Sequence, residues 1–226
     1  MELKNRDHED KQGDFLAVAD RIASTASVFY SRGWLLGTSG NLSAVVSKDP
    51  LRIAITGSGL HKGNLDASDI IEIDGDGNII SGEQKVSSET ALHLAVIRVL
   101  HAGSVFHTHS VWSTILSRKY LKDGGIVLEG YEMLKGLENV STHSHREWLP
   151  ILENSQDMTS LSLMVSDILG KYPDVHGFLL AGHGLYTWGK TAGDAERQVE
   201  VLEFLLEVFA RSDPGTANIQ GKHEHP

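Results

Sequence analysis

Two histidines at the end of an apolar stretch are the first residues whose type and spacing suggest chemistry. His107 and His109 lie near the end of residues 104–110, a stretch typical of a buried strand. Residues two apart in a strand point to the same face, so the two imidazoles are expected side by side. Neutral imidazole is a common ligand of zinc and related divalent ions. The pair suggests a metal site, although a chain with 12 histidines also produces such pairs by chance.

A third ligand is expected from His183. It follows the apolar residues 177–180 and lies between Gly182 and Gly184. Glycine has no Cβ, so it lets another part of the backbone approach closely. Three imidazoles with one open coordination position would form a catalytic metal site.

The absence of cysteine limits the choice of metal ligands to nitrogen and oxygen donors. A second histidine pair, His143 and His145, stands in the polar sequence Ser-Thr-His-Ser-His-Arg. We predict a loop there rather than a metal site, because this sequence is too polar for a buried strand.

The net charge of −10, without a cluster of Lys and Arg, argues against a nucleic-acid-binding protein. An anionic substrate would need backbone amides or a metal ion to bind.

Hydrophobic periodicity predicts the elements that hold these residues. Helical spacing is found at residues 15–33, 90–100, 111–120, 158–172 and 192–211, and strand patterns at 51–55, 70–74, 78–80, 104–110, 126–128, 175–180 and 185–188. The turn Gly75-Asp-Gly77 predicts a hairpin, so the sheet should be at least partly antiparallel.

The length of 226 residues favours one domain, which we place at 14–211 between a flexible leader at 1–13 and a flexible tail at 212–226. The hydrophobic fraction of 40% and charged fraction of 22% are typical of a soluble globular protein. The chain lacks the run of about 20 apolar residues that a membrane helix needs. Its polar N-terminus does not resemble a signal peptide, so we expect a cytoplasmic protein that does not cross a membrane.

Three polar segments could bind a phosphate group. Two are turns next to strands, Ser39-Gly-Asn41 and Thr56-Gly-Ser-Gly59, and the third is Ser87-Ser-Glu89 at the start of a helix. Each also has a structural explanation, since Ser-Gly-Asn is an ordinary turn and Ser87 or Ser88 could cap the helix. Glu89 likewise suits the first turn of a helix because of the helix dipole.

These segments, in this order with His107-Thr-His109 and Gly182-His-Gly184, resemble the class II aldolase and adducin family over almost the whole chain. The resemblance implies a three-layer α/β/α fold with a mostly antiparallel central sheet, and usually a homotetramer with sites near subunit contacts. It also implies one zinc ion per subunit on three ligands, which match His107, His109 and His183. The same resemblance implies that Asn41, Thr56, Gly57, Ser87 and Ser88 bind the substrate phosphate.

Within the family, residues 130–136 and 184–189 resemble a branch that dehydrates a phosphorylated ketose. The acid/base carboxylate of that branch matches Glu132, which we expect to be semi-buried beside Tyr131 and Met133 with a raised pKa. In the aldolases of the family, the proton-transferring carboxylate matches Glu89. In this protein we expect Glu89 to be either a base or an extra metal ligand. The alternatives are an aldolase or a pentulose-phosphate epimerase and, more remotely, an adducin-like non-enzymatic binding module, in which the metal ligands are expected to be lost.

Overall fold

Nine strands form one sheet at the centre of the protein. The computed structural model describes residues 2–213, with side chains from residue 15 onward. The strands are β1 (Asn41–Lys48), β2 (Leu51–Thr56), β3 (Ile70–Asp74), β4 (Ile79–Ser81), β5 (Ser104–Thr108), β6 (Gly125–Glu129), β7 (Arg146–Leu152), β8 (Gly177–Leu180) and β9 (Gly184–Gly189). Their order across the sheet is β4-β3-β2-β1-β5-β9-β8-β7-β6. Strands β7 and β8 pair in parallel and the other neighbours pair antiparallel, which confirms the mostly antiparallel sheet.

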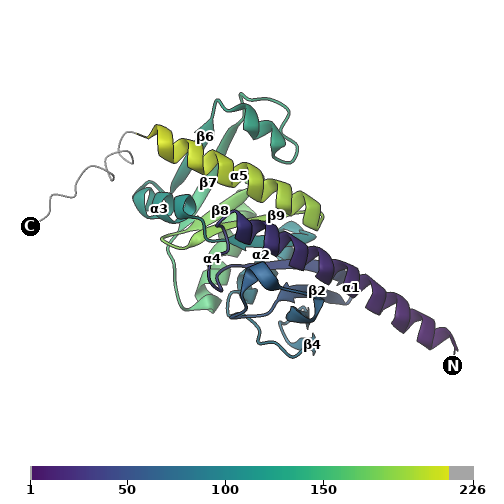
Figure 1. Ribbon diagram of the computed structural model, residues 1–226. Helices are drawn as coiled ribbons and strands as arrows, with labels where there is room; N and C mark the ends of the chain where they lie inside the picture. The colour runs from purple at the N-terminus through teal and green to yellow at the C-terminus, as the bar shows by residue number, and fades with distance from the viewer. Residues whose placement is uncertain (1, 214–226) are drawn as a thin grey trace, which may run out of the picture.

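Helices cover both faces of this sheet (Figure 1). The long ones are α1 (Glu2–Ser31), α2 (Thr90–Leu100), α3 (Val111–Lys119), α4 (Met158–Lys171) and α5 (Ala192–Ser212). The short 3-10 helices are η1 (Lys62–Asn64), η2 (Ala67–Asp69), η3 (Leu121–Asp123) and η4 (Glu132–Gly136). Helices α2 and α4 pack on one face, and α1, α3 and α5 pack on the other. The predicted three-layer α/β/α fold is therefore confirmed.

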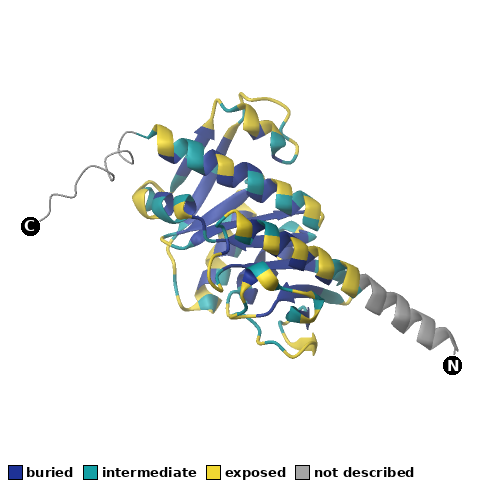
Figure 2. Ribbon diagram, in the orientation of Figure 1, coloured by how far each residue is buried: buried dark blue, intermediate teal, exposed yellow. Residues whose placement is uncertain are grey.

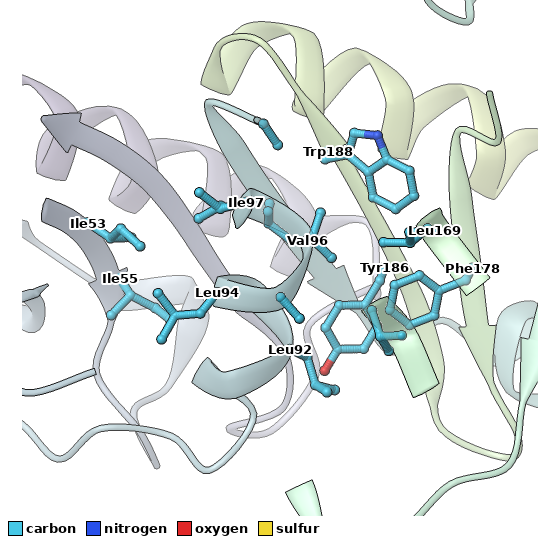
Figure 3. Close-up of a cluster of buried hydrophobic side chains, with 14 of the residues drawn as sticks. Ile53, Ile55, Leu92, Leu94, Val96, Ile97, Leu169, Phe178, Tyr186 and Trp188 are labelled. Carbon is cyan, nitrogen blue, oxygen red and sulfur yellow. The ribbon is translucent and has the colours of Figure 1, made fainter. Parts of the chain in front are cut away.

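Strand β8 shows why both faces need a helical layer. Phe178 and Leu180 pack with Leu169 of α4, whereas Leu179 between them packs with Leu205 of α5. Successive residues of a strand point to opposite faces, so a strand apolar at every position must be buried on both sides. Figure 2 shows the buried strands between the helical layers, and Figure 3 shows Phe178 beside Tyr186 in the core next to α2 and α4.

Some boundaries differ from those that the sequence suggested. Helix α1 begins at Glu2, so it starts earlier than the apolar spacing indicated. The polar residues 141–145 form a loop as predicted, but β7 follows directly and was not anticipated. The division into leader, domain and tail stays a prediction, and residues 214–226 of that tail lie outside the described residues. Among the described residues, no helix is long and apolar enough to cross a membrane.

Candidate active site

Three histidines and one carboxylate meet beside the end of β5. His107 lies in β5, His109 follows it, His183 precedes β9 and Glu89 precedes α2. Their ligand atoms all lie within 4.8 Å of one another. His107 Nε2 is 2.7 Å from His109 Nε2 and 3.3 Å from His183 Nε2. Glu89 Oε1 lies 3.0 Å from His183 Nε2, so four side chains could hold one metal ion.

Two glycines let the backbone come close enough to form this cluster. A Cβ at Gly184 would lie 2.0 Å from the carbonyl oxygen of Thr108, far inside van der Waals contact. A Cβ at Gly40 would lie 2.6 Å from the carbonyl oxygen of His107, and the φ of +69° at Gly40 also favours glycine. The close backbone approach expected beside His183 is confirmed at Gly184.

His107 and His109 are held as neutral imidazoles, and His107 is oriented to act as a ligand. His107 Nδ1 lies 2.9 Å from the carbonyl oxygen of Leu185, which only accepts, so the ring proton is on Nδ1 and Nε2 keeps its lone pair. Burial, with His109 adding to it, lowers the pKa of His107 well below its usual value. Burial also lowers the pKa of His109 to about 4. Tyr186 stacks on His107 at 3.9 Å between ring centroids, which restricts rotation of the imidazole.

Glu89 is held as a carboxylate by a chain of buried polar groups. Burial alone would raise its pKa, but hydrogen bonds from His183 and Asn41 and the nearby imidazoles hold the pKa of Glu89 well below its usual range. Asn41 Nδ2 donates to Glu89 Oε2 at 2.7 Å, and Asn41 Oδ1 contacts His93 Nε2. His93 Nδ1 lies 2.7 Å from Ser43 Oγ. This series of contacts from Ser43 through His93 and Asn41 fixes which oxygen of Glu89 faces the histidines.

His93 of α2 belongs to this buried polar network, a role that was not expected from the sequence. Its side chain is 1% exposed, and burial lowers the pKa of His93 to about 4. A local signal existed, because His93 follows Glu89 by four residues and such residues share one helix face. The N-cap of α2 is Glu89 itself, without a side-chain cap bond, rather than Ser87 or Ser88.

A buried lysine lies near the cluster and was missed in the sequence. Lys62 is 1% exposed, and its Nζ donates to the carbonyl oxygens of Leu60 at 3.0 Å and Thr38 at 3.2 Å. Burial lowers the pKa of Lys62, while the negative charge of Glu89 partly opposes this shift. Its positive charge in turn contributes to the lowered pKa of His109. No motif around Lys62 signalled that its side chain would be buried.

The five residues expected to bind phosphate are only partly free to do so. The amide of Gly57 donates to the carbonyl oxygen of Asp69 at 2.9 Å, and Thr56 Oγ1 accepts from the amide of Leu42 at 3.3 Å. Asn41 is committed to Glu89, as described above. Ser87 Oγ lies 3.4 Å from Asn41 Nδ2, and Ser88 is exposed, so these two residues are more open to solvent than Asn41 and Thr56, which are buried.

Glu132 lies outside the histidine cluster in the single chain. Its side chain is 71% exposed, so the prediction that this carboxyl is semi-buried is wrong for a single copy of the chain. A hydrogen bond from Lys135 holds the pKa of Glu132 below its ordinary value, where we expected it to be raised. Its other neighbouring charge is His143, whose Nδ1 lies 3.8 Å from Glu132 Oε2. The ion pair with Lys135 thus replaces the apolar surroundings that the sequence suggested.

Comparison with known proteins identifies the family. Residues 20–210 match the class II aldolase and adducin N-terminal domain. The chain belongs to the class II aldolase and adducin family. Its relatives include the methylthioribulose-1-phosphate dehydratase of Methylococcus capsulatus, 45% identical over 88% of this chain and 95% of the relative. The dehydratase of the same name from Marinobacter nauticus is 39% identical over 85% of this chain and 92% of its own length.

Solved structures of this family share the fold. YgbL from Escherichia coli superposes with a TM-score of 0.73 at 26% identity, covering 88% of this chain and 92% of its own. An L-fuculose 1-phosphate aldolase superposes with a TM-score of 0.72 at 20% identity, covering 91% of this chain and 88% of its own. At 20% identity the aldolase is evidence for the fold alone.

Proposed function

We propose that this protein is a zinc-dependent dehydratase that converts 5-methylthioribulose 1-phosphate to 2,3-diketo-5-methylthiopentyl 1-phosphate and water, as in methionine salvage. The observation that carries the proposal is the intact cluster of His107, His109, His183 and Glu89. It occurs in a chain 39–45% identical to proteins named methylthioribulose-1-phosphate dehydratase. The reaction requires loss of the C3 proton and departure of the C4 hydroxyl, so it needs a base and an acid.

The donor set fits zinc. Three imidazoles with a carboxylate that can yield to substrate are typical ligands of a catalytic zinc ion, and the chain has no cysteine to form a thiolate site. We assign His107, His109 and His183 as the ligands of one zinc ion per subunit. When bound, this ion supplies Lewis acidity that polarises the substrate ketone and makes the C3 proton easier to remove.

Glu89 is proposed as the base that removes the C3 proton. It is ionised at neutral pH because its pKa is held low, and Asn41 occupies Oε2 at 2.7 Å. That leaves Oε1, which faces the histidines, to accept a proton from a substrate bound there. Lys62 adds a buried positive charge nearby, which favours negative charge developing on the substrate.

Glu132 is proposed as the acid that protonates the departing C4 hydroxyl, acting in the site of a second copy of the chain. In one chain it lies on the surface beside a cavity of about 530 Å³ lined by Met133, Phe204 and Val208. Met133 is 38% and Phe204 46% exposed, an apolar surface that another copy would cover. Packing there would remove water from Glu132 and raise its pKa toward that of a useful acid. We therefore propose a homo-oligomer, a tetramer by the resemblance stated above.

The substrate phosphate is proposed to bind at the start of α2. The hydroxyls of Ser87 and Ser88 precede this helix, whose first amides and dipole favour an anion. Asn41, Thr56 and Gly57 complete the proposed pocket, with Asn41 held in place by Glu89 and His93.

A product assay tests this function. Metal-loaded protein is incubated with 5-methylthioribulose 1-phosphate, and the products are analysed by mass spectrometry, with His109→Ala as the control for the metal site. Loss of one water from the substrate is expected. Cleavage of a carbon–carbon bond would instead identify an aldolase, and an isomer of unchanged mass would identify an epimerase. If this sugar phosphate is not turned over, the dehydratase assignment is wrong.

A further inference from the structure

A second group of metal-ligand side chains lies at the opposite end of β8 from His183. Glu147 is at the start of β7, His145 precedes it by two residues, and His176 directly precedes β8. Glu147 Oε2 lies 2.8 Å from His145 Nε2 and 2.8 Å from His176 Nδ1. These three ligand atoms all lie within 4.8 Å of one another. Glu147 is 2% exposed, so the group is not a solvated surface cluster.

Both ring nitrogens of His176 face acceptor oxygens, so this group needs either a second proton on the imidazole or a metal ion. His176 Nε2 lies 2.8 Å from the carbonyl oxygen of Glu138, which only accepts, so in a neutral imidazole the one ring proton is on Nε2. Nδ1 then points a lone pair at the carboxylate oxygen of Glu147, 2.8 Å away. Two lone pairs at this distance repel unless a proton or a metal ion lies between or beside them. His107 in the first cluster likewise has one ring nitrogen, there Nδ1, on a carbonyl oxygen, that of Leu185, and its other nitrogen faces the remaining ligands.

The backbone holds these ligands before any ion binds. The amide of His176 donates to Glu147 Oε1 at 2.9 Å, which turns Oε2 toward the two imidazoles. Thr187 Oγ1 donates to the carbonyl oxygen of His176 at 2.6 Å and fixes the backbone at this position. Hydrogen bonds that orient a ligating imidazole and a ligating carboxylate in this way are a usual feature of metal sites. An ion binding here would need little rearrangement.

A cavity beside the group provides room for water ligands. It has a volume of about 310 Å³, and its lining includes His145, His176, Trp188 and Gln198. Gln198 is 1% exposed, and within residues 15–213 its Oε1 has no hydrogen-bond partner. A buried carbonyl oxygen without a partner is costly, so this atom calls for a donor inside the cavity. A metal-bound water is a donor of the required kind.

We propose that His145, Glu147 and His176 form a second divalent-metal site, separate from the first cluster. Two imidazoles and one carboxylate with open positions for water suit zinc, cobalt or nickel rather than calcium or magnesium. Strand β8 separates His176 from His183 of the first cluster, and its four residues span about 13 Å at the usual rise per residue. The ion would link the loop at His145 to Glu147 of β7 and to His176 before β8. The other ring nitrogen of His176 contacts the carbonyl oxygen of Glu138. The proposed site does not depend on the proposed reaction.

Metal stoichiometry tests this site. The full chain is equilibrated at micromolar free zinc, and bound zinc is measured by inductively coupled plasma mass spectrometry. We expect two zinc ions per chain in the unmodified protein and one in His145→Ala. The matched control is His143→Ala, two residues away in the same loop and 62% exposed, which should keep both ions. Circular dichroism confirms folding, and His145→Gln serves as a second variant of more similar size if His145→Ala does not fold.

Variants at the two clusters separate failure of this site from failure of the first. His109→Ala should keep one ion, and the double variant with His145→Ala should keep none. If the unmodified protein binds one ion that is lost with His109→Ala but kept with His145→Ala, the second site is refuted and the cation on His176 is a proton. If the single ion is lost with His145→Ala but kept with His109→Ala, the second site stands and the first ligand assignment fails.

Discussion

Replacement of Glu203 tests how a buried carboxyl behind the histidines affects stability. Glu203 of α5 is 2% exposed, and it accepts a hydrogen bond of 2.6 Å from Thr108, which lies between His107 and His109. Burial raises the pKa of Glu203 from 4.5 to about 7. The carboxyl is therefore easier to keep protonated in the folded protein than in the unfolded chain.

The sign of the pH dependence follows from these two pKa values. Below pH 4.5 the Glu203 carboxyl is protonated in both states and does not change the free energy of unfolding. As pH rises toward 7, the unfolded chain releases the proton and the folded protein keeps it, so stability falls. Above about pH 7 both states are ionised and the cost stays constant. The gap between the pKa values corresponds to a cost of about 3 kcal/mol at about pH 8.

Glu203→Gln removes this cost and keeps an oxygen that accepts from Thr108. In urea unfolding of the metal-free protein, the variant should exceed the unmodified protein by about 3 kcal/mol near pH 8 and by less than about 1 kcal/mol near pH 5. The control is Glu200→Gln on the same helix, whose side chain is 39% exposed and pairs with Arg32. Its effect should stay within about 1 kcal/mol at every pH. A difference for Glu203→Gln that does not grow with pH, or a variant less stable near pH 8, would refute the reasoning.

Four further substitutions test the site. His109→Ala should lose the zinc of the first cluster and dehydratase activity, and retained zinc would contradict the ligand assignment. Glu132→Gln should lower turnover by about 10²–10⁴ with zinc still bound, because an amide cannot deliver a proton; near-normal turnover would exclude Glu132 as the acid. Glu89→Gln should stop exchange of the substrate's C3 proton with deuterated solvent, measured by NMR, and surviving exchange would exclude Glu89 as the base. Gly184→Ala should lower stability in urea unfolding by about 1–3 kcal/mol through the clash with Thr108; unchanged stability would contradict that close contact.

The sequence by itself determined those parts of the site that depend on local geometry. Residues two apart in a strand share a face, so His107 and His109 could be placed side by side from spacing alone. The glycine at position 184 indicated a close backbone approach, which the carbonyl group of Thr108 makes. The hairpin at Gly75-Asp-Gly77 and the apolar periodicity likewise predicted antiparallel strands and most of the helices. Each of these features depends on a few neighbouring residues and a fixed repeat of the backbone.

Only the tertiary structure decided which groups meet across long separations. Glu147 and His176 are 29 residues apart and come together because β7 and β8 pair in parallel, which no local pattern announced. Lys62 is buried because the chain around it folds over its side chain, and a lysine in a polar segment looks exposed in the sequence. The reverse holds for Glu132, whose apolar neighbours in sequence do not cover it in space. Burial and pairing across long separations are set by the packing of whole elements against each other, and local sequence spacing does not specify which elements meet.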